Sequence, residues 1–93
     1  MDRKQQAALA ESFRAMHQGS EVLLLPNAWD AMSARLFGVA GFRAIATSSA
    51  GVAWALGYPD GEAAPWGEVL AATARIVRVA GGPVSADIEG GYG

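Results

Sequence analysis

The chain has 93 residues, so it forms at most one small domain. Hydrophobic residues make up 52% and charged residues 17%, a composition that excludes a disordered tail. Seven basic residues, scattered along the sequence, and nine acidic ones give a net charge of −2, which argues against a surface for nucleic acid or an anionic membrane. There is no cysteine, so a disulfide framework, a thiolate nucleophile and a Cys-type zinc site are excluded.

Neither a secretory signal nor a membrane-spanning segment is apparent in the sequence. The start, MDRKQQAALAES, is polar where a signal peptide has its apolar region. The uncharged run between Arg43 and Tyr58 has 14 residues, which is too short and too rich in glycine to cross a bilayer. We therefore expect a cytoplasmic protein that binds neither nucleic acid nor membranes.

The first predicted elements are a helix and a strand. Apolar and small residues recur at helical spacing over residues 3–18, and Gly19 would end this amphipathic helix. Val22–Leu25 is a continuous apolar run closed by Pro26, which is typical of a strand buried on both faces of a parallel sheet.

A second helix and a second strand follow. Asn27 is predicted to be the N-cap of a helix from about Ala28 to Val39, with Asp30 in its first turn. Residues 42–47 (FRAIAT) then predict a short strand.

The second half repeats the alternation. Residues 48–57 are a stretch of mainly small residues, and Tyr58–Gly61 (YPDG) predicts a turn. Pro65 suits the first position of a helix that continues to Val79, and residues 84–88 predict a third strand before a glycine-rich end.

This order of elements predicts an α/β fold with parallel strands joined by right-handed crossovers. A parallel sheet needs helices on both faces or closure into a barrel, and three strands with three helices achieve neither. We therefore interpret the 93 residues as the opening portion of a larger fold of about 250 residues, so that the chain is a fragment or needs partners to complete it.

The carboxyl ends of parallel strands collect ligands, and two acids follow the third predicted strand. Asp87 and Glu89 are separated by one residue, so in an extended strand both side chains would point the same way. Two carboxylates beside a glycine-rich turn suit a hard cation such as Mg²⁺. Two solvated acids at a strand end are an equally good interpretation of this spacing alone.

Two further segments are expected at the same edge, residues 26–30 and residues 47–51 with the loop to Asp60. Residues 47–51 (TSSAG) offer hydroxyl and unhindered N–H groups that can hold a carboxylate or phosphonate, although an ordinary capping turn is the interpretation that the residues alone favour. Asp60 lies in a Pro-Asp-Gly turn, and taken alone it is a structural turn residue.

Taken together, LLLPNAWDAMSARL, AIATSSAGVAWALGYPDGE and PVSADIEGGYG resemble the isocitrate lyase/phosphoenolpyruvate mutase superfamily, in particular its phosphonomutase-like and 2-methylisocitrate-lyase-like members. The resemblance runs from about residue 12 to the last residue. It implies a TIM (β/α)8 barrel, usually tetrameric with a helix swapped between subunits. Residues 1–93 would then be the N-terminal fragment of a single barrel domain, with the first three βα units preceded by an N-terminal helix.

The resemblance also implies site roles. Thr47, Ser48 and Ser49 match the loop that binds the substrate carboxylate or oxyanion, and Asp60 matches a site aspartate on a mobile gating segment. Asp87 matches the direct Mg²⁺ ligand (Mn²⁺ being an alternative), and Glu89 the second acid, which acts through metal-bound water. Many members have Asp where this chain has Glu89. The general-acid cysteine of the lyases, and a further glutamate and arginine of the site, would lie beyond Gly93.

Two functions follow as hypotheses. The first is a Mg²⁺-dependent enzyme that makes or breaks a C–C or P–C bond in a small 2-oxo or 2-hydroxy carboxylate through an enolpyruvate-like anion, as a lyase, decarboxylase or mutase. The second is a truncated, inactive chain that at most binds a metal or anion weakly or self-associates.

Overall fold

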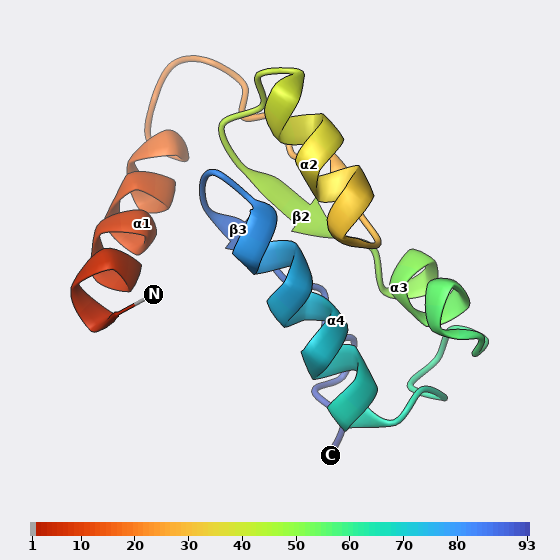
Figure 1. Cartoon of the computed structure of the whole chain (residues 1–93). Helices are drawn as coiled ribbons and strands as arrows, with labels where there is room; N and C mark the ends of the chain where they lie inside the picture. Colours follow the sequence, from red (N-terminus) through yellow and green to blue (C-terminus); the bar gives the residue numbers. More distant parts are fainter. Residues whose placement is uncertain (1) are drawn as a thin grey trace.

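A computed structural model describes residues 2–93 as an α/β fold in which the helices lie around a small sheet (Figure 1). Its elements in chain order are α1 (Arg3–Met16), β1 (Asn27–Ala28), α2 (Ala31–Val39), β2 (Ile45–Thr47), α3 (Ser49–Leu56), α4 (Trp66–Val79) and β3 (Val84–Ser85).

The three strands form one parallel sheet in the order β1-β2-β3. Asn27 lies opposite Ala46 between the first two strands, and Ile45 lies opposite Val84 between the second and third. The parallel arrangement predicted from the alternation of elements is therefore confirmed. Because all three strands run the same way, their carboxyl ends meet at one edge.

The core lies between the sheet and helices α2, α3 and α4. α2 and α4 pack side by side and α3 contacts α4 (Figure 1). Ile76 of α4 and Ala28 of β1 are completely buried at the centre of a cluster. The cluster is completed by Ala34, Ile45, Val52 and Ala72. Most of its members are alanine or valine, so the elements approach closely but each residue buries little apolar area.

Helix α1 lies apart from this core, at the left of Figure 1. It begins with a capping box in which the Asp2 carboxylate accepts from the Gln5 amide at 2.8 Å, and none of its residues is buried. Among residues 2–93, no helix has both the length and the apolar character needed to cross a membrane.

The strand predicted over Val22–Leu25 is wrong, because pairing with β2 begins only at Pro26. The Pro26 carbonyl accepts from the Ala46 amide at 2.9 Å, and strand β1 is Asn27–Ala28. Val22 is 84% exposed and Leu24 65%, whereas Leu23 and Leu25 are partly buried. β1 is an outer strand of the sheet, so β2 is its only neighbour. β2 begins at Ile45 and does not extend far enough toward the amino end to pair with residues 22–25.

The predicted start of the second helix also needs correction. Asn27 belongs to β1, and the N-cap of α2 is Asp30. The Asp30 carboxylate accepts from the Ser33 amide at 2.7 Å, while the Ser33 hydroxyl accepts from the Asp30 amide at 3.2 Å. This reciprocal pair satisfies two donors at the helix start and fixes where the helix begins.

A helix also forms where only a stretch of small residues was expected. α3 begins after the N-cap Ser48 and ends at Gly57, whose φ of 90° is the left-handed conformation that favours glycine. The predicted strands over residues 42–47 and 84–88 are shorter in the structure. Because α3 is an additional helix and residues 86–93 contain none, the description as three βα units holds only for the order of the strands.

Candidate functional site

The carboxyl ends of β2 and β3 are joined by a hydrogen bond between two residues of the predicted site. The Asp87 amide donates to the Thr47 hydroxyl oxygen at 2.9 Å. Thr47 is only 3% exposed whereas Asp87 is exposed, so the bond is partly shielded from water on the side of its acceptor. It holds the start of the loop that carries Asp87 against the segment that leads into α3.

Two further predicted residues, Ser48 and Ser49, lie at the start of α3. The Ser48 hydroxyl accepts from the Gly51 amide at 3.0 Å, as an N-cap does. The close approach of α3 to Trp29 requires glycine at position 51, where a Cβ would lie 2.8 Å from the Trp29 Cβ. Helix geometry leaves the first N–H groups of α3 without acceptors inside the helix, so Ser49 can offer an amide to an anion.

Asp87 and Glu89 do not project together from an extended strand, as their spacing predicted. β3 ends at Ser85, and Glu89 has a φ of 55°, so the alternation of side chains along a strand does not apply. One Asp87 carboxylate oxygen, Oδ1, accepts from the Glu89 amide at 3.0 Å. The two acids are neighbours, but Glu89 turns toward a different segment.

That segment is the turn that carries Asp60. The Glu89 carboxylate accepts from two consecutive amides, Gly61 to Oε1 and Glu62 to Oε2, both at 3.1 Å. Asp60 itself is exposed at this turn. The structure therefore brings the predicted residue Asp60 close to Glu89, through hydrogen bonds that link positions 27 and 28 residues apart.

Two residues outside the predicted set complete this arrangement. The Tyr92 amide donates to the Glu62 carboxylate at 2.6 Å, and the Tyr92 hydroxyl donates to Glu89 Oε2 at 3.0 Å. The Tyr92 ring also lies 5.1 Å from the ring of Trp66, centroid to centroid. Partial burial and the bond to Glu89 raise the pKa of Tyr92 above its ordinary value. No local sequence pattern marks Glu62 or Tyr92, because the bond between them spans 30 positions.

The acidic side chains of Asp87 and Glu89 would supply only some of the ligands that a hard cation needs. Asp87 supplies carboxylate oxygens, and Glu89 stands beside it, which is oxygen chemistry of the kind that Mg²⁺ prefers. Within residues 2–93, however, no three acidic, histidine or cysteine side chains are grouped closely enough to hold a metal ion. The residues present therefore fit a metal that takes most of its ligands from water or from groups outside the described part of the chain.

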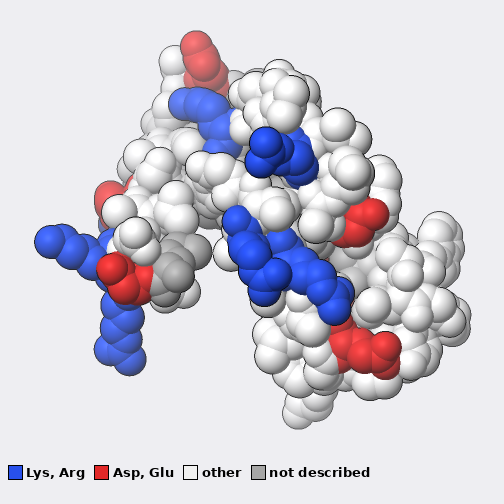
Figure 2. All heavy atoms as spheres, viewed as in Figure 1, with Lys and Arg blue, Asp and Glu red and all other residues white. Residues whose placement is uncertain are grey.

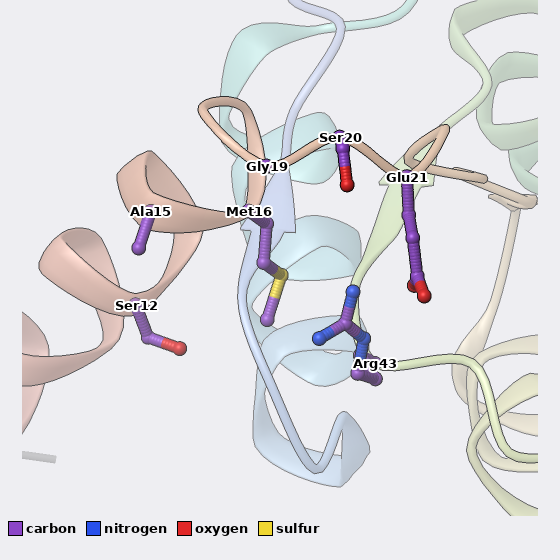
Figure 3. A pocket seen from close by; sticks show the side chains of 7 residues that line it. All are labelled: Ser12, Ala15, Met16, Gly19, Ser20, Glu21 and Arg43. Carbon is purple, nitrogen blue, oxygen red and sulfur yellow. The ribbon is translucent and has the colours of Figure 1, made fainter.

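Hollows occur at both ends of the sheet. One of about 480 Å³ is lined by Trp29, Asp30, Gly51, Trp54 and Ala55, beside the start of α3. Trp29 is 45% exposed and Trp54 69%, so neither belongs to the core. Another hollow, of about 440 Å³, lies between the end of α1 and Arg43, which precedes β2, with the Arg43 and Glu21 side chains reaching toward the same space (Figure 3). This second hollow is at the amino end of the sheet, away from the predicted site.

Charged side chains are spread over several elements on the face seen in Figure 2, and basic ones gather over the middle of it, where α4 lies. α4 carries two exposed arginines, Arg75 and Arg78. Among the described residues the only ion pair joins Arg14 to Glu11 on α1, at 3.7 Å. Electrostatic pairing therefore contributes little to the fold.

Comparison with known proteins finds relatives that match most of this chain in sequence. An uncharacterised protein of Mycobacterium tuberculosis is 42% identical over 81 residues, which cover 87% of this chain and 31% of that protein. 2-Methylisocitrate lyase from Bacillus subtilis is 35% identical over 88 residues, covering 95% of this chain and 29% of the lyase. The chain thus spans less than a third of the length of these relatives.

Solved structures of similar proteins also superpose on most of this chain. A presumed lyase/mutase from Burkholderia cenocepacia J2315 superposes with a TM-score of 0.87 at 48% identity, over 95% of this chain and 31% of that one. 2,3-Dimethylmalate lyase, a member of the PEP mutase/isocitrate lyase superfamily, superposes with a TM-score of 0.79 at 30% identity, over 91% and 30% of the two chains. The family model of phosphoenolpyruvate phosphomutase matches residues 13–93, and the chain therefore belongs to this family.

Proposed function

We propose that a protein carrying this chain is a Mg²⁺-dependent lyase or mutase. It would make or break a C–C or P–C bond in a small 2-oxo or 2-hydroxy carboxylate through an enolpyruvate-like anion, with residues 1–93 as the N-terminal part of one TIM-barrel domain. The observation that supports this most strongly is the bond between the Asp87 amide and the Thr47 hydroxyl, since it joins the two segments that supply the proposed acid and hydroxyl groups. The relatives named as lyases support the same reaction class.

The substrate carboxylate is proposed to bind at the start of α3. The Ser48 hydroxyl accepts from Gly51 and keeps its own proton to donate, and Ser49 offers a first-turn amide. Thr47 is too buried to offer much surface to a ligand, so its contribution would come through the bond that holds Asp87. Backbone and hydroxyl donors fixed in this way stabilise an anion without reorganising as charge develops.

Asp87 would hold the metal directly, through the carboxylate oxygen that does not accept from Glu89, and Glu89 would act through a bound water. Mg²⁺, or Mn²⁺ as an alternative, would supply stabilisation of the negative charge on the enolpyruvate-like anion.

Asp60 is proposed as the catalytic residue, because it lies exposed on the turn that Glu89 holds beside this edge. We also propose that the protein carrying this chain is a homo-oligomer, such as the tetramer that the resemblance implies.

The metal role is tested in the longer protein that carries this chain and the rest of the barrel. Purified protein is assayed with oxaloacetate, 2-methylisocitrate and phosphonopyruvate across a Mg²⁺ titration. Asp87→Ala should lower kcat/KM by at least about a hundredfold, without recovery at saturating Mg²⁺. Glu21→Ala, an exposed glutamate near the other end of the sheet, serves as the control and should leave the rate unchanged. Full activity of Asp87→Ala at high Mg²⁺ would contradict the proposal.

The 93 residues alone are expected to be inactive, which is the second hypothesis. Residues 2–93 bring together no three metal-ligating side chains, so a bound ion would be held weakly. We expect no turnover of the same three substrates by the isolated chain. Mg²⁺-dependent cleavage by it would show that the described residues suffice for catalysis.

A further inference from the structure

Three residues of the described chain combine an unusual backbone with mutual hydrogen bonds. Glu62, Glu89 and Tyr92 have φ values of 61°, 55° and 61°, and they are the only residues other than glycine with positive φ among residues 2–93. A left-handed conformation is uncommon for side chains of this size, and it persists only where surrounding contacts impose it. All three residues with this conformation lie close together, so local contacts must hold their backbones in it.

The cause is a closed set of bonds among the same residues. The Glu62 amide donates to Glu89, the Tyr92 hydroxyl donates to Glu89, and the Tyr92 amide donates to Glu62. Each residue is therefore bonded to both of the others, although Glu62 lies 27 positions before Glu89 in sequence. The Gly61 amide adds a fourth bond to the Glu89 carboxylate.

This arrangement joins two loops that carry different parts of the proposed site. Glu62 lies in the turn that contains Asp60, whereas Glu89 and Tyr92 follow Asp87. Asp87 is in turn fixed to β2 through Thr47. A carboxylate that accepts from consecutive backbone amides makes charge-assisted bonds, which are stronger than those between neutral groups.

From these observations we propose that Glu62, Glu89 and Tyr92 form a latch that holds the Asp60 turn against the Asp87 loop, and that they act as positioning residues for the site. The inference rests on the proposed function for its catalytic meaning, but the latch itself can be measured without substrate or metal. It also gives a reason for glutamate at position 89, because aspartate is shorter by one methylene and would not reach the Gly61 and Glu62 amides from the same backbone.

Amide hydrogen exchange measured by NMR on protein carrying this chain, without Mg²⁺, tests the latch. Glu89→Asp keeps the charge, and with it the ability to bind a metal through water. We expect it to accelerate exchange of the Gly61 and Glu62 amides about tenfold. Unchanged exchange at both amides would overturn the proposal. The amide of Ile76 in the core of α4 reports whether the fold is intact, and its exchange should not change.

A second pair of variants tests whether the bonds act together. Glu62→Ala removes the acceptor of the Tyr92 amide, and Glu62→Gln keeps an accepting oxygen in the same place. We expect about tenfold faster exchange at Tyr92 in Glu62→Ala, with faster exchange at Gly61 as well, and values within about twofold of the parent protein in Glu62→Gln. Acceleration confined to Tyr92 would show an isolated bond and would overturn the latch.

Activity separates this proposal from the proposed function. In an active longer protein, Glu62→Ala should lower kcat with an unchanged Mg²⁺ requirement, and Glu62→Gln should restore it. If all proteins were inactive while the exchange results held, the proposed function would fail and the latch would stand. A fully active Glu62→Ala with fast Tyr92 exchange would overturn the positioning role.

Discussion

The backbone amide of Asp87 donates a hydrogen bond to the side-chain oxygen of Thr47, 40 positions earlier in the chain, at 2.9 Å. The acceptor is almost completely buried, and the bond as a whole is partly buried. It connects the carboxyl ends of β2 and β3 at the point where both strands give way to loops. The position of the Asp87 loop thus depends on a side chain of the neighbouring strand.

Replacing this acceptor should destabilise the protein. Thr47→Val keeps the shape of the side chain but leaves the Asp87 amide without its protein partner, and we expect a loss of about 0.5–1.5 kcal/mol in the free energy of unfolding. Urea denaturation followed by circular dichroism measures it. Thr73→Val is the matched control, since the Thr73 hydroxyl donates to the Val69 carbonyl within α4 and its removal leaves no backbone amide without its acceptor. An effect of Thr47→Val no larger than that of Thr73→Val would refute this role.

The start of α3 depends on the absence of a side chain at position 51. Gly51→Ala would place a methyl group 2.8 Å from the Trp29 Cβ and 3.2 Å from the Ser48 hydroxyl oxygen, so the helix must shift. We expect a destabilisation of about 1–3 kcal/mol. Gly67→Ala in α4 is the control, because a Cβ there meets no atom within 4 Å. That change should be neutral or stabilising by about 0.5 kcal/mol, and thermal melts of both variants check the contrast.

Much of the arrangement of the sheet could be predicted from the sequence, for reasons visible in particular residues. The alternation of apolar runs with helical patterns predicts parallel strands, and parallel strands bring Thr47 and Asp87 to one edge. The pairing of Ile45 with Val84 and the bond at this edge agree with that reasoning. Strand boundaries were harder, because hydrophobicity alone does not show that Val22 and Leu24 lack a neighbouring strand.

The parts that could not be predicted depend on long-range bonds or on weak local patterns. α3 has no amphipathic repeat, and Trp54 on it is largely exposed, so only Ser48 and Gly57 at its ends mark it as a helix. The orientation of Glu89 was predicted from strand alternation, which fails because its φ is positive. Nothing near Glu89 in the sequence indicates that its carboxylate binds the amides of residues 61 and 62.

The N-cap of α2 provides a third prediction. Asp30→Ala removes the carboxylate that accepts from the Ser33 amide, and we expect a loss of about 1 kcal/mol in the free energy of unfolding. Asp30→Asn keeps an accepting oxygen and should lose less than half of that amount. Asn27→Ala tests the alternative start of the helix at position 27. A larger loss from Asn27→Ala than from Asp30→Ala, measured by chemical denaturation, would place the cap where the sequence alone suggested.

The last prediction concerns the alkaline range. The Tyr58 hydroxyl donates to the Glu68 carboxylate at 2.7 Å, and this bond, with the nearby negative charge, raises the pKa of Tyr58 above its ordinary value of 10.0. The folded protein therefore holds the phenol proton more tightly than the unfolded chain does. The stabilisation is fully present below pH 10 and is lost as the pH rises through the higher pKa of the folded state. Glu68→Ala should return the pKa of Tyr58 toward its ordinary value.

Ultraviolet titration of tyrosinate measures this shift. The chain has two tyrosines, so the difference between the parent protein and Tyr58→Phe reports Tyr58. The parent protein should titrate at Tyr58 above pH 10, and the same difference measured in the Glu68→Ala background should move down. Identical midpoints in the two backgrounds would mean that Glu68 does not hold the phenol. The link between the segment after α3 and the first turn of α4 would then have to come from other contacts.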